Sequence, residues 1–512
     1  MNSKTADIRV LLIRLSALGD VVHTLPAADL LRRNLPAAKI TWVVEAPFAE
    51  LLRNNPAVDD VIIFPKKKIS SELKNPISWL DPSSEFNKFI GELRSRNFSA
   101  ALDFQGLFKS GAIAYLSGAP TRVGFAQARE LSQIFLTDRC DTGDYFANDK
   151  HVVHHNVELS EFYLRIAGGA NQKSPTIRFP LPILNSQLIA SVIEMIGAST
   201  VEPPQKVNRA RITNTNILSA LIRKEDRVQP QMEPGDVVAP VESSAASGAE
   251  LPTSTGRELP AATGAELPAA TGKLDALSKD SVGAASAMVP TPPAEPAPSA
   301  EPLPQIAKNG EKLIVLIPGT TWITKIWPKE KWAQLVSQLV QIPNARIVLV
   351  GGPAETEMNS YIYDQVSRSV ADRLRPNSSH VQNSGPSDPT SVPISERLID
   401  ITGKTTISGL LALLKFADIV VGADTGPLHM AVAAEHPFVI GIHGSTPWLR
   451  NGPLGEKSSV VALNLGCQPC FEKKCPLGTL ACLRDLNIET VLAEINRVLN
   501  VVDMRTAGAE KP

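Results

Sequence analysis

The stretch VVGADTGPLH, residues 420–429, joins a strand end, a glycine turn and the start of a helix. Pro427 suits the first turn of a helix, where its missing N–H costs nothing, and Thr425 suits the N-cap before it. The free N–H groups and positive dipole end of such a helix start are typical of a phosphate site. Asp424 could bond a ribose or a base, and His429 could reach the same anion. The simpler alternative is a well-capped turn with a histidine in the core.

A second cluster with chemical potential is the glycine turn SALGD, residues 16–20, which leads into a helix. Asp20 is the candidate general base, because a carboxylate facing a cleft can take a proton as that proton becomes acidic in the transition state. A helix start lowers the pKa of a carboxylate and so weakens it as a base. The alternative role is a first-turn carboxylate that stabilises the helix. His23 is the competing base and is also expected to face the substrate that loses this proton.

A third cluster follows the apolar run KLIVLI, residues 312–317, in the sequence PGTTWITKIWP. Small hydroxyl groups and a lysine directly after a strand suit a phosphate group, since threonine donates hydrogen bonds and lysine supplies a compact charge. We therefore expect Thr320, Thr321 and Lys325 to bind phosphate. Taken alone, Lys325 could equally be an exposed surface residue.

Four of the five cysteines fall within sixteen residues, at positions 467, 470, 475 and 482. Such a density could bind zinc or an iron–sulfur cluster, but the spacing matches none of the standard zinc patterns. Free structural thiols and redox-sensitive pairs are the alternatives. We expect free thiols, with less than one metal ion per chain.

The elements that must position these residues follow an α/β pattern. Short apolar runs alternate with amphipathic segments in both halves, which predicts two doubly wound sheets. Ligands of such sheets bind beyond the carboxyl ends of the strands, where we place residues 16–23, 103–109 and 122–125 of the first half. Neither half contains the GxGxxG pattern of dinucleotide-dependent dehydrogenases. The predicted strands are residues 8–15, 39–45, 58–64, 99–104 and 121–125, then 312–317, 345–351, 398–403, 418–421 and 438–443.

Composition bounds the remaining possibilities. The chain has 512 residues, 43% of them apolar, and a formal net charge of −1. The balanced charge argues against non-specific binding of nucleic acid, and Lys66–Lys68 is either a solvated loop or a contact for anionic headgroups. No secretory leader and no apolar run of the ~18 residues that span a bilayer are visible. We therefore expect a cytoplasmic protein.

The middle of the chain differs from both halves. Residues 229–305 are rich in Pro, Ala, Ser, Gly and Glu, and contain the near-repeats GAELPTST, GRELPAAT and GAELPAAT. An eight-residue unit with one leucine cannot bury an apolar face, which predicts disorder rather than a solenoid. The predicted organisation is an N-terminal domain over 1–198, a mostly disordered insertion over 199–310 and a C-terminal domain over 311–512. Residues 376–395 form a smaller predicted insertion.

Six motifs in order carry a resemblance to a known family, and they are VLLIRLSALGDVVHTLPA (10–27), WVVEAPFAELL (42–52), DFQGLFKSG (103–111), RVGF (122–125), PGTTWITKIWP (318–328) and ADTGPLHMAVA (423–433). Together they resemble the ADP-heptose:lipopolysaccharide heptosyltransferases, glycosyltransferase family nine, over about residues 1–198 and 311–500. The first half is most similar to the heptosyltransferase I group. The resemblance implies the GT-B fold, two Rossmann-like domains that face a cleft, with donor binding in the second.

The resemblance also implies a reaction. It is an inverting transfer of L-glycero-D-manno-heptose from ADP-heptose to the Kdo of a Kdo–lipid A acceptor, at the inner face of the cytoplasmic membrane, with no essential cofactor or metal. Asp20 matches the base, and Lys325 matches the residue that stabilises the departing ADP. The matched donor-binding residues are Thr320, Thr321, Lys325, Glu355, Asp424, Thr425, Gly426 and His429. Lys109 and Arg122 match positions near the anionic acceptor.

Two alternatives stay open. One is another family member with a different acceptor or sugar, such as heptosyltransferase II or III. The other is an ADP-binding regulatory protein without catalysis, against which the presence of both Asp20 and Lys325 argues.

Overall fold

The computed structural model describes residues 8–72, 81, 83–145, 147, 149–168, 176–197, 311–373 and 393–509. The two stretches on either side of the predicted insertion, 1–203 and 300–512, belong to one compact unit. The predicted insertion and nearly all of the smaller one lie outside the described residues, so both stay predictions. None of the helices in the described part has the length and apolarity to cross a membrane.

The first half of the chain builds a six-stranded parallel sheet in the order β3-β2-β1-β4-β5-β6. Its apolar strands are buried because helices cover a parallel sheet on both faces. The strands are β1 (Arg9–Ile13), β2 (Lys39–Glu45), β3 (Asp60–Phe64), β4 (Ala100–Asp103), β5 (Thr121–Phe125) and β6 (Asp138–Cys140). The helices are α1 (Leu18–Asn34), α2 (Lys66–Glu72), α3 (Glu85–Ser95), α4 (Phe108–Leu116) and α5 (Val152–Ile166).

The second half repeats this topology in the order β12-β11-β10-β7-β8-β9. The predicted fold class, two doubly wound α/β sheets, is confirmed. The strands are β7 (Lys312–Ile317), β8 (Ala345–Leu349), β9 (Leu398–Asp400), β10 (Ile419–Ala423), β11 (Phe438–Ile442) and β12 (Ser458–Val461). The helices are α8 (Lys329–Leu339), α9 (Thr356–Arg373), α10 (Ile394–Arg397), α11 (Ile407–Phe416), α12 (Gly426–Ala433), α13 (Trp448–Asn451), α14 (Ala481–Arg484) and α15 (Ile488–Ala509). Short 3₁₀ helices cover Ala46–Leu51, Ser132–Phe135, Ile323–Lys325 and Pro353–Glu355.

Each sheet has a point where the strand order reverses, and ligands of open α/β sheets bind there. In the first sheet it lies between β1 and β4, where Ile13 pairs with Asp103. In the second it lies between β7 and β10, where Ile317 pairs with Gly422. The chain leaves β1 toward Asp20, β7 toward Thr320 and β10 toward Asp424, so three of the predicted clusters follow strands at these points.

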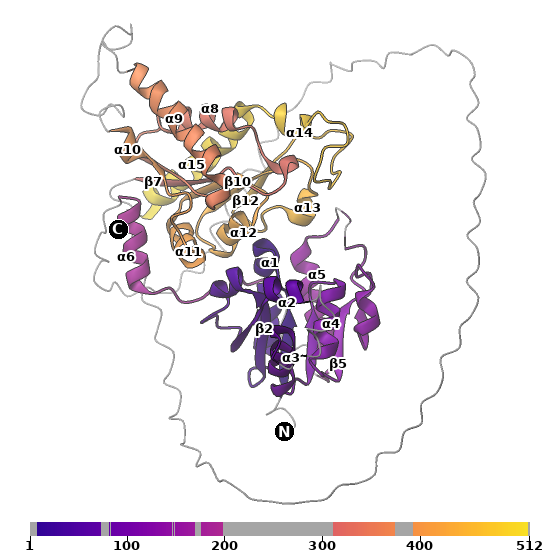
Figure 1. Ribbon diagram of the computed structural model, residues 1–512. Coiled ribbons are helices and arrows are strands. Elements are labelled where there is room, and N and C mark those ends of the chain that lie inside the picture. Colours follow the sequence, from indigo (N-terminus) through magenta and orange to yellow (C-terminus); the bar gives the residue numbers. More distant parts are fainter. Residues whose placement is uncertain are drawn as a thin grey trace, which may run out of the picture. The chain divides into compact units, whose positions relative to one another are not determined.

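Helix α6 (Ser186–Met195) comes late in the first half of the sequence but packs against α11 of the second (Figure 1). Arg346 of β8 contacts the chain on both sides of the undescribed segment 198–310. Its Nη1 donates to the carbonyl of Ile196 at 2.5 Å, and its Nε contacts a carboxylate oxygen of Glu311 at 2.6 Å. The chain therefore leaves the described part at Gly197 and re-enters it at Glu311 beside one guanidinium group.

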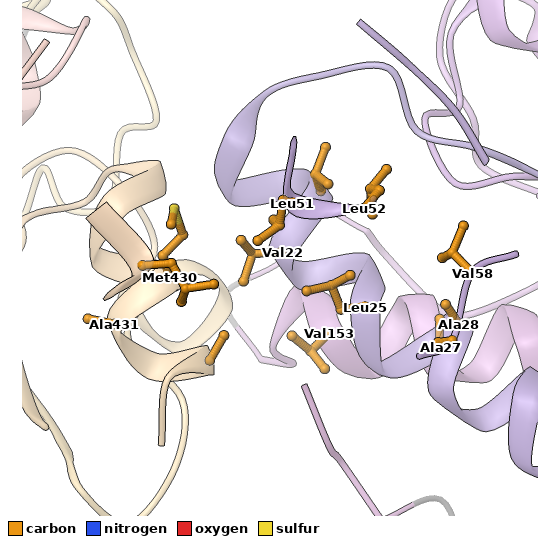
Figure 2. Close-up of a cluster of buried hydrophobic side chains, with 14 of the residues drawn as sticks. Val22, Leu25, Ala27, Ala28, Leu51, Leu52, Val58, Val153, Met430 and Ala431 are labelled. Atoms are coloured by element: carbon orange, nitrogen blue, oxygen red, sulfur yellow. The ribbon is translucent and has the colours of Figure 1, made fainter. Parts of the chain in front are cut away.

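One hydrophobic core extends through both sheets. Helix α1 packs against α12, and Figure 2 shows Val22 of α1 facing Met430 of α12. The same cluster of buried side chains contains Val10 and Leu12 of β1 together with Val315 of β7. The far faces of the two sheets have separate cores.

Candidate active site

A cleft of about 1040 Å³ is lined by loops that follow the strands of both sheets. It brings together most of the site residues predicted from the sequence. Those that line it are Asp20, His23, Thr320, Thr321, Lys325, Asp424, Thr425, Gly426 and His429. The three that are not among its lining residues are Lys109, Arg122 and Glu355.

The two helix starts that border the cleft touch each other at glycines. A Cβ added to Gly426 would lie 2.7 Å from Cβ of Leu18, and a Cβ added to Gly19 would lie 2.9 Å from Cδ2 of His429. A side chain at either position would therefore push α1 and α12 apart. Thr425 occupies the N-cap position of α12 as predicted, but its side chain makes no capping hydrogen bond. The positive ends of both helix dipoles meet at this contact.

Asp20 is oriented by a buried arginine. One of its carboxylate oxygens lies 2.6 Å from Nη2 of Arg14, and the other accepts a hydrogen bond from the N–H of Ala17 at 3.2 Å. The side chain of Arg14 is 4% exposed, whereas that of Asp20 is 39% exposed. Arg14 also donates to the carbonyl of Phe104. The carboxylate is thus held from behind and stays accessible from the cleft, as a general base needs.

Asp103, which the sequence analysis did not single out as a site residue, organises the loop beside Asp20. One oxygen accepts from the N–H groups of Gln105 at 2.9 Å and Gly106 at 3.0 Å, and the other from the hydroxyl of Ser110 at 3.0 Å. Gln105 in turn accepts from the N–H of Leu15 at 3.0 Å. Burial raises the pKa of Asp103 to about 6, although these hydrogen bonds oppose the shift. A carboxylate at a strand end three residues before a glycine was the available signal.

Lys325 and Asp424 form an ion pair at 2.8 Å on the second-half side of the cleft. Their side chains are 14% and 4% exposed, and Nε2 of His429 lies 3.2 Å from the second oxygen of Asp424. Burial acts to raise the pKa of Asp424, but Lys325 and His429 outweigh it and hold that pKa well below its usual range. Asp424 is therefore a buried carboxylate that already neutralises the lysine predicted to meet the phosphate.

Three histidines from both halves pack together, two of which, His23 and His429, line the cleft. The ring of His23 lies 4.2 Å from that of His429 and 5.5 Å from that of His151, centroid to centroid. Burial, followed by the neighbouring histidines, lowers the pKa of His23 well below its usual value, and burial lowers that of His151 to about 4. Neither ring nitrogen of His23 has a hydrogen-bond partner among the described residues. The imidazole of His23 is therefore buried and neutral near pH 7, whereas the carboxylate of Asp20 is 39% exposed.

Arg450 is a further cleft residue that the sequence analysis missed. Its Nε donates to the carbonyl of Tyr145 at 2.6 Å, and its guanidinium lies 4.7 Å from the centre of the Tyr145 ring. Burial lowers the pKa of Arg450. Because no local pattern marks a pair separated by three hundred residues, the sequence held no signal for this contact.

Of the three residues predicted to face the acceptor, His23 lines the cleft, whereas Lys109 and Arg122 are not among its lining residues. Arg122 is the second residue of β5, so its placement at the carboxyl end of a strand was wrong. Its guanidinium donates to the carbonyls of Phe135 at 2.7 Å and Ala119 at 2.8 Å. Nζ of Lys109 lies 3.8 Å from a carboxylate oxygen of Glu45. Their roles toward an acceptor stay predictions.

Glu355 closes its own turn. Its carboxylate accepts from the N–H of Gly352 at 2.7 Å. Its side chain also lies against Gly319, where a Cβ would overlap Cγ of Glu355 at 2.0 Å. The turn after β8 is therefore packed on the turn after β7, and a nucleoside contact by Glu355 stays a prediction.

The basic run Lys66–Lys68 begins helix α2 and is not a loop. Nζ of Lys66 lies 3.1 Å from a carboxylate oxygen of Glu45, and Nζ of Lys68 lies 3.3 Å from one of Glu85. Glu45 also lies 3.8 Å from Lys109, and Glu85 also pairs with Lys88, so these two carboxylates do not balance the lysines of the run, and the headgroup contact stays an alternative.

The four clustered cysteines all line one small cavity of about 130 Å³, together with Thr324 and Ser445. Backbone N–H groups, first that of Leu480, lower the pKa of Cys475. Burial, followed by the other three cysteines, raises the pKa of Cys482 to about 11. In the described ranges, no three His, Cys, Asp or Glu side chains are grouped closely enough to hold a metal ion.

Comparison with known proteins places these features in a family. The sequence model of "Glycosyltransferase family 9 (heptosyltransferase)" matches residues 86–180, 277–375 and 391–481, more than half of the chain. Lipooligosaccharide heptosyltransferase 2 of Campylobacter jejuni is 29% identical over 198 residues, which are 38% of this chain and 54% of that protein. Lipopolysaccharide heptosyltransferase 1 of Escherichia coli K12 is 31% identical over 156 residues, 30% of this chain and 46% of that protein. The chain spans about half the length of the curated relatives it matches.

Solved structures share the fold. The E. coli heptosyltransferase WaaC with ADP superposes with a TM-score of 0.54 at 18% identity, over 96% of this chain and 100% of that one. The E. coli ADP-heptose LPS heptosyltransferase II superposes with a TM-score of 0.55 at 15% identity, over 97% of this chain and 100% of that one.

Proposed function

Because this chain belongs to glycosyltransferase family 9, we propose that it transfers L-glycero-D-manno-heptose from ADP-heptose to the Kdo of the lipopolysaccharide inner core, with inversion at the sugar carbon. The observation that carries the proposal is the single cleft that holds Asp20 of the first half and the Lys325–Asp424 pair of the second. An inverting transfer needs a base on one side of the sugar and a site for the leaving diphosphate on the other.

In this proposal, Asp20 removes the proton of the attacking Kdo hydroxyl. Arg14 fixes the direction of the carboxylate, because its guanidinium is buried and aimed at one oxygen. The proton ends on the accessible carboxylate while the hydroxyl oxygen bonds to the sugar carbon. Loss of a general base costs on the order of 10²–10⁴-fold in rate.

The leaving ADP takes the second-half side of the cleft. Thr320 and Thr321 follow β7, and the N–H groups at the start of α12 follow β10, so both switch-point loops converge on one anion. Lys325 adds a cation where negative charge grows as the sugar–oxygen bond breaks. Hydrogen-bond donors and cations that are already in place stabilise the transition state more than they stabilise bound ADP-heptose.

The relatives include both heptosyltransferase 1 and heptosyltransferase 2. The experiment must therefore distinguish the two by the acceptor that each would use. We would measure ADP release with Kdo–lipid A and with Kdo–lipid A that already carries one heptose. Turnover on the first alone is the expected result and assigns heptosyltransferase I. Turnover on the second alone would assign heptosyltransferase II, and ADP binding without turnover on either would favour the regulatory protein.

Asp20→Asn tests the base in the same assay. Turnover should fall by about 10²–10⁴-fold while calorimetry still shows ADP binding, because Asp20 is on α1 and the diphosphate residues are in the second half. Asp29→Asn is the matched control, since Asp29 is on the same helix but is not among the cleft residues and pairs with Arg33 at 2.7 Å. Near-normal turnover of a folded Asp20→Asn protein would reject the assignment.

The cytoplasmic membrane as a partner rests on the lipid nature of this acceptor. Vesicles with and without Kdo–lipid A would test it by co-sedimentation. Equal binding to both vesicles would assign the attachment to the bilayer, and selective binding to the first would assign it to the acceptor.

A further inference from the structure

Trp322, on the loop after β7, lies close to two lysines. Nζ of Lys325 is 4.6 Å from the centre of its ring, and Nζ of Lys473 is 5.3 Å from the same centre. All three residues line the cleft, together with Thr320 and Thr321. An aromatic ring attracts one cation favourably, but two cations over one ring repel each other unless an anion joins them.

The charge of Lys325 is already balanced. Asp424 lies 2.8 Å from its Nζ in a buried position, and no solvent separates them. A diphosphate carries more negative charge than this neutral pair can balance, and the helix start of α12 contributes only about half an elementary charge. A second cation is therefore needed on the same side of the cleft.

Lys473 is the residue positioned to supply it. In the described part of the chain no carboxylate forms an ion pair with Lys473, and its side chain is exposed on the cleft wall. Glu472, its neighbour in sequence, also lines the cleft and carries the opposite charge. Lys473 is thus a cation on this wall that an incoming anion can reach, and Glu472 limits the net charge of the wall.

The loop that carries Lys473 is fixed to the phosphate-binding loop. The N–H of Phe471 donates to the carbonyl of Ser445 at 2.7 Å, and the hydroxyl of Thr324 donates to the carbonyl of Glu472 at 2.6 Å. The ring of Phe471 lies 5.8 Å from that of Trp322. Because Thr324 directly precedes Lys325, this one hydrogen bond ties the backbone beside Lys473 to the side chain of the residue beside Lys325.

We propose that Lys473 is a second cation that binds the diphosphate of the nucleotide donor, on the same side of the cleft as the Lys325–Asp424 pair, an inference that rests on the proposed donor class. In this role Lys473 binds the diphosphate and supplies positive charge. Lys325 alone does not provide enough, because Asp424 already neutralises it. The diphosphate, and not the base or the sugar, is the group that it recognises.

The test uses the full chain and three probes, which are ADP, AMP and inorganic pyrophosphate. Calorimetry of Lys473→Gln should show ADP and pyrophosphate binding weakened by about tenfold or more, the size of a lost charged hydrogen bond, and AMP binding changed by roughly twofold at most. Lys474→Gln is the matched control, because Lys474 is adjacent and equally charged but is not among the cleft residues. It should bind all three probes as the wild type does.

Glu472→Gln gives a control of opposite sign. Removal of a negative charge from the same wall should tighten ADP binding. An effect of Lys473→Gln that Lys474→Gln reproduces would be a general charge effect and would overturn the proposal, as would unchanged ADP and pyrophosphate binding in Lys473→Gln.

The probes also separate this inference from the proposed function. If the wild type binds pyrophosphate but not ADP, the donor class is wrong and the pyrophosphate data alone decide the role of Lys473. If the wild type binds ADP and Lys473→Gln binds it equally well, the donor class survives and the inference fails. If the wild type binds neither, both are rejected.

Discussion

The pairing of Lys325 with Asp424 gives two different consequences for one substitution. In Lys325→Ala the diphosphate loses a cation, and Asp424, 4% exposed, is left in the protein without its partner. An uncompensated buried charge typically costs about 3–5 kcal/mol. We therefore expect Lys325→Ala to lower kcat by a larger factor than it weakens binding of the sugar donor. The same variant should also have a lower free energy of unfolding, measured in urea.

A double variant separates the two effects. Lys325→Met combined with Asp424→Asn removes both charges, so stability should largely return while turnover stays low. If Lys325→Ala unfolds at the same urea concentration as the wild type, Asp424 is not held by the lysine. If kcat of the variant is unchanged while affinity and kcat/KM fall by equal factors, the lysine is a uniform binding group.

The clustered cysteines should differ in reactivity although they share one cavity. The thiolate is the nucleophile, so a thiol of lowered pKa reacts faster at neutral pH. Cys475 has a lowered pKa, whereas the pKa of buried Cys482 is raised to about 11. Brief treatment of the folded protein with iodoacetamide, followed by peptide mass spectrometry, should label Cys475 well before Cys482. Labelling in the reverse order would show that the cavity has another arrangement in solution.

Metal analysis of the purified protein belongs to the same experiment. The prediction of less than one zinc or iron per chain stands, and one tightly held metal per chain would overturn it. Loss of that metal together with stability in Cys470→Ser would then assign it to this cavity.

Asp103, at the end of strand β4, makes the stability of the folded protein depend on pH. Burial raises the pKa of Asp103 from 3.8 to about 6, so its charged form is penalised in the folded protein. The stability that depends on this group is fully present below about pH 4 and is lost as the pH rises through about 6.

Asp103→Asn tests this dependence, since the amide keeps the shape of the side chain and an acceptor for the loop N–H groups. Between pH 5 and pH 8, the free energy of unfolding of the variant should rise relative to that of the wild type by roughly 1 kcal/mol. Asp485→Asn, at a position whose side chain is 54% exposed, is the control and should show no such trend. A pH-independent difference for Asp103→Asn would mean that Asp103 stays charged throughout.

The sequence predicted most of the elements and the positions of several candidate site residues, and it could do so for a physical reason. Apolar runs mark buried parallel strands, and residues that directly follow such runs must lie at one edge of the sheet, so Thr320 and Asp424 could be placed without a structure. Arg122 was misplaced because the short run TRVGF does not tell which residue ends the strand; its second residue points to carbonyls at the other end. The short strands β6 and β12 were missed since three or four residues give no clear period.

Contacts between distant segments could not be predicted in this way. Arg450 with Tyr145, and Lys473 with Trp322, each join segments that are far apart in the sequence. Lys473 stands in a segment that the sequence marked only for its cysteines. The sequence shows that this segment carries lysines, but it does not show that the segment packs against the loop of Trp322.

The described residues on either side of the predicted insertion, Ile196 and Glu311, both contact Arg346. A short linker can therefore join Gly197 to Glu311 without strain on α6 or β7. We expect replacement of residues 229–305 by a few flexible residues to leave folding and turnover near those of the full chain. Loss of turnover with retained folding would give the segment a role in the reaction, and its resistance to dilute protease in the full chain would contradict the predicted disorder.

The packing of α1 on α12 makes the two sheets parts of one buried cluster. Two domains with separate cores melt independently, whereas a shared core couples them into one cooperative transition. Heating in a calorimeter should accordingly give a single endotherm. A nucleotide bound on the second half should then raise the melting temperature of the first half by the same amount, since its binding free energy is shared by the whole cooperative unit.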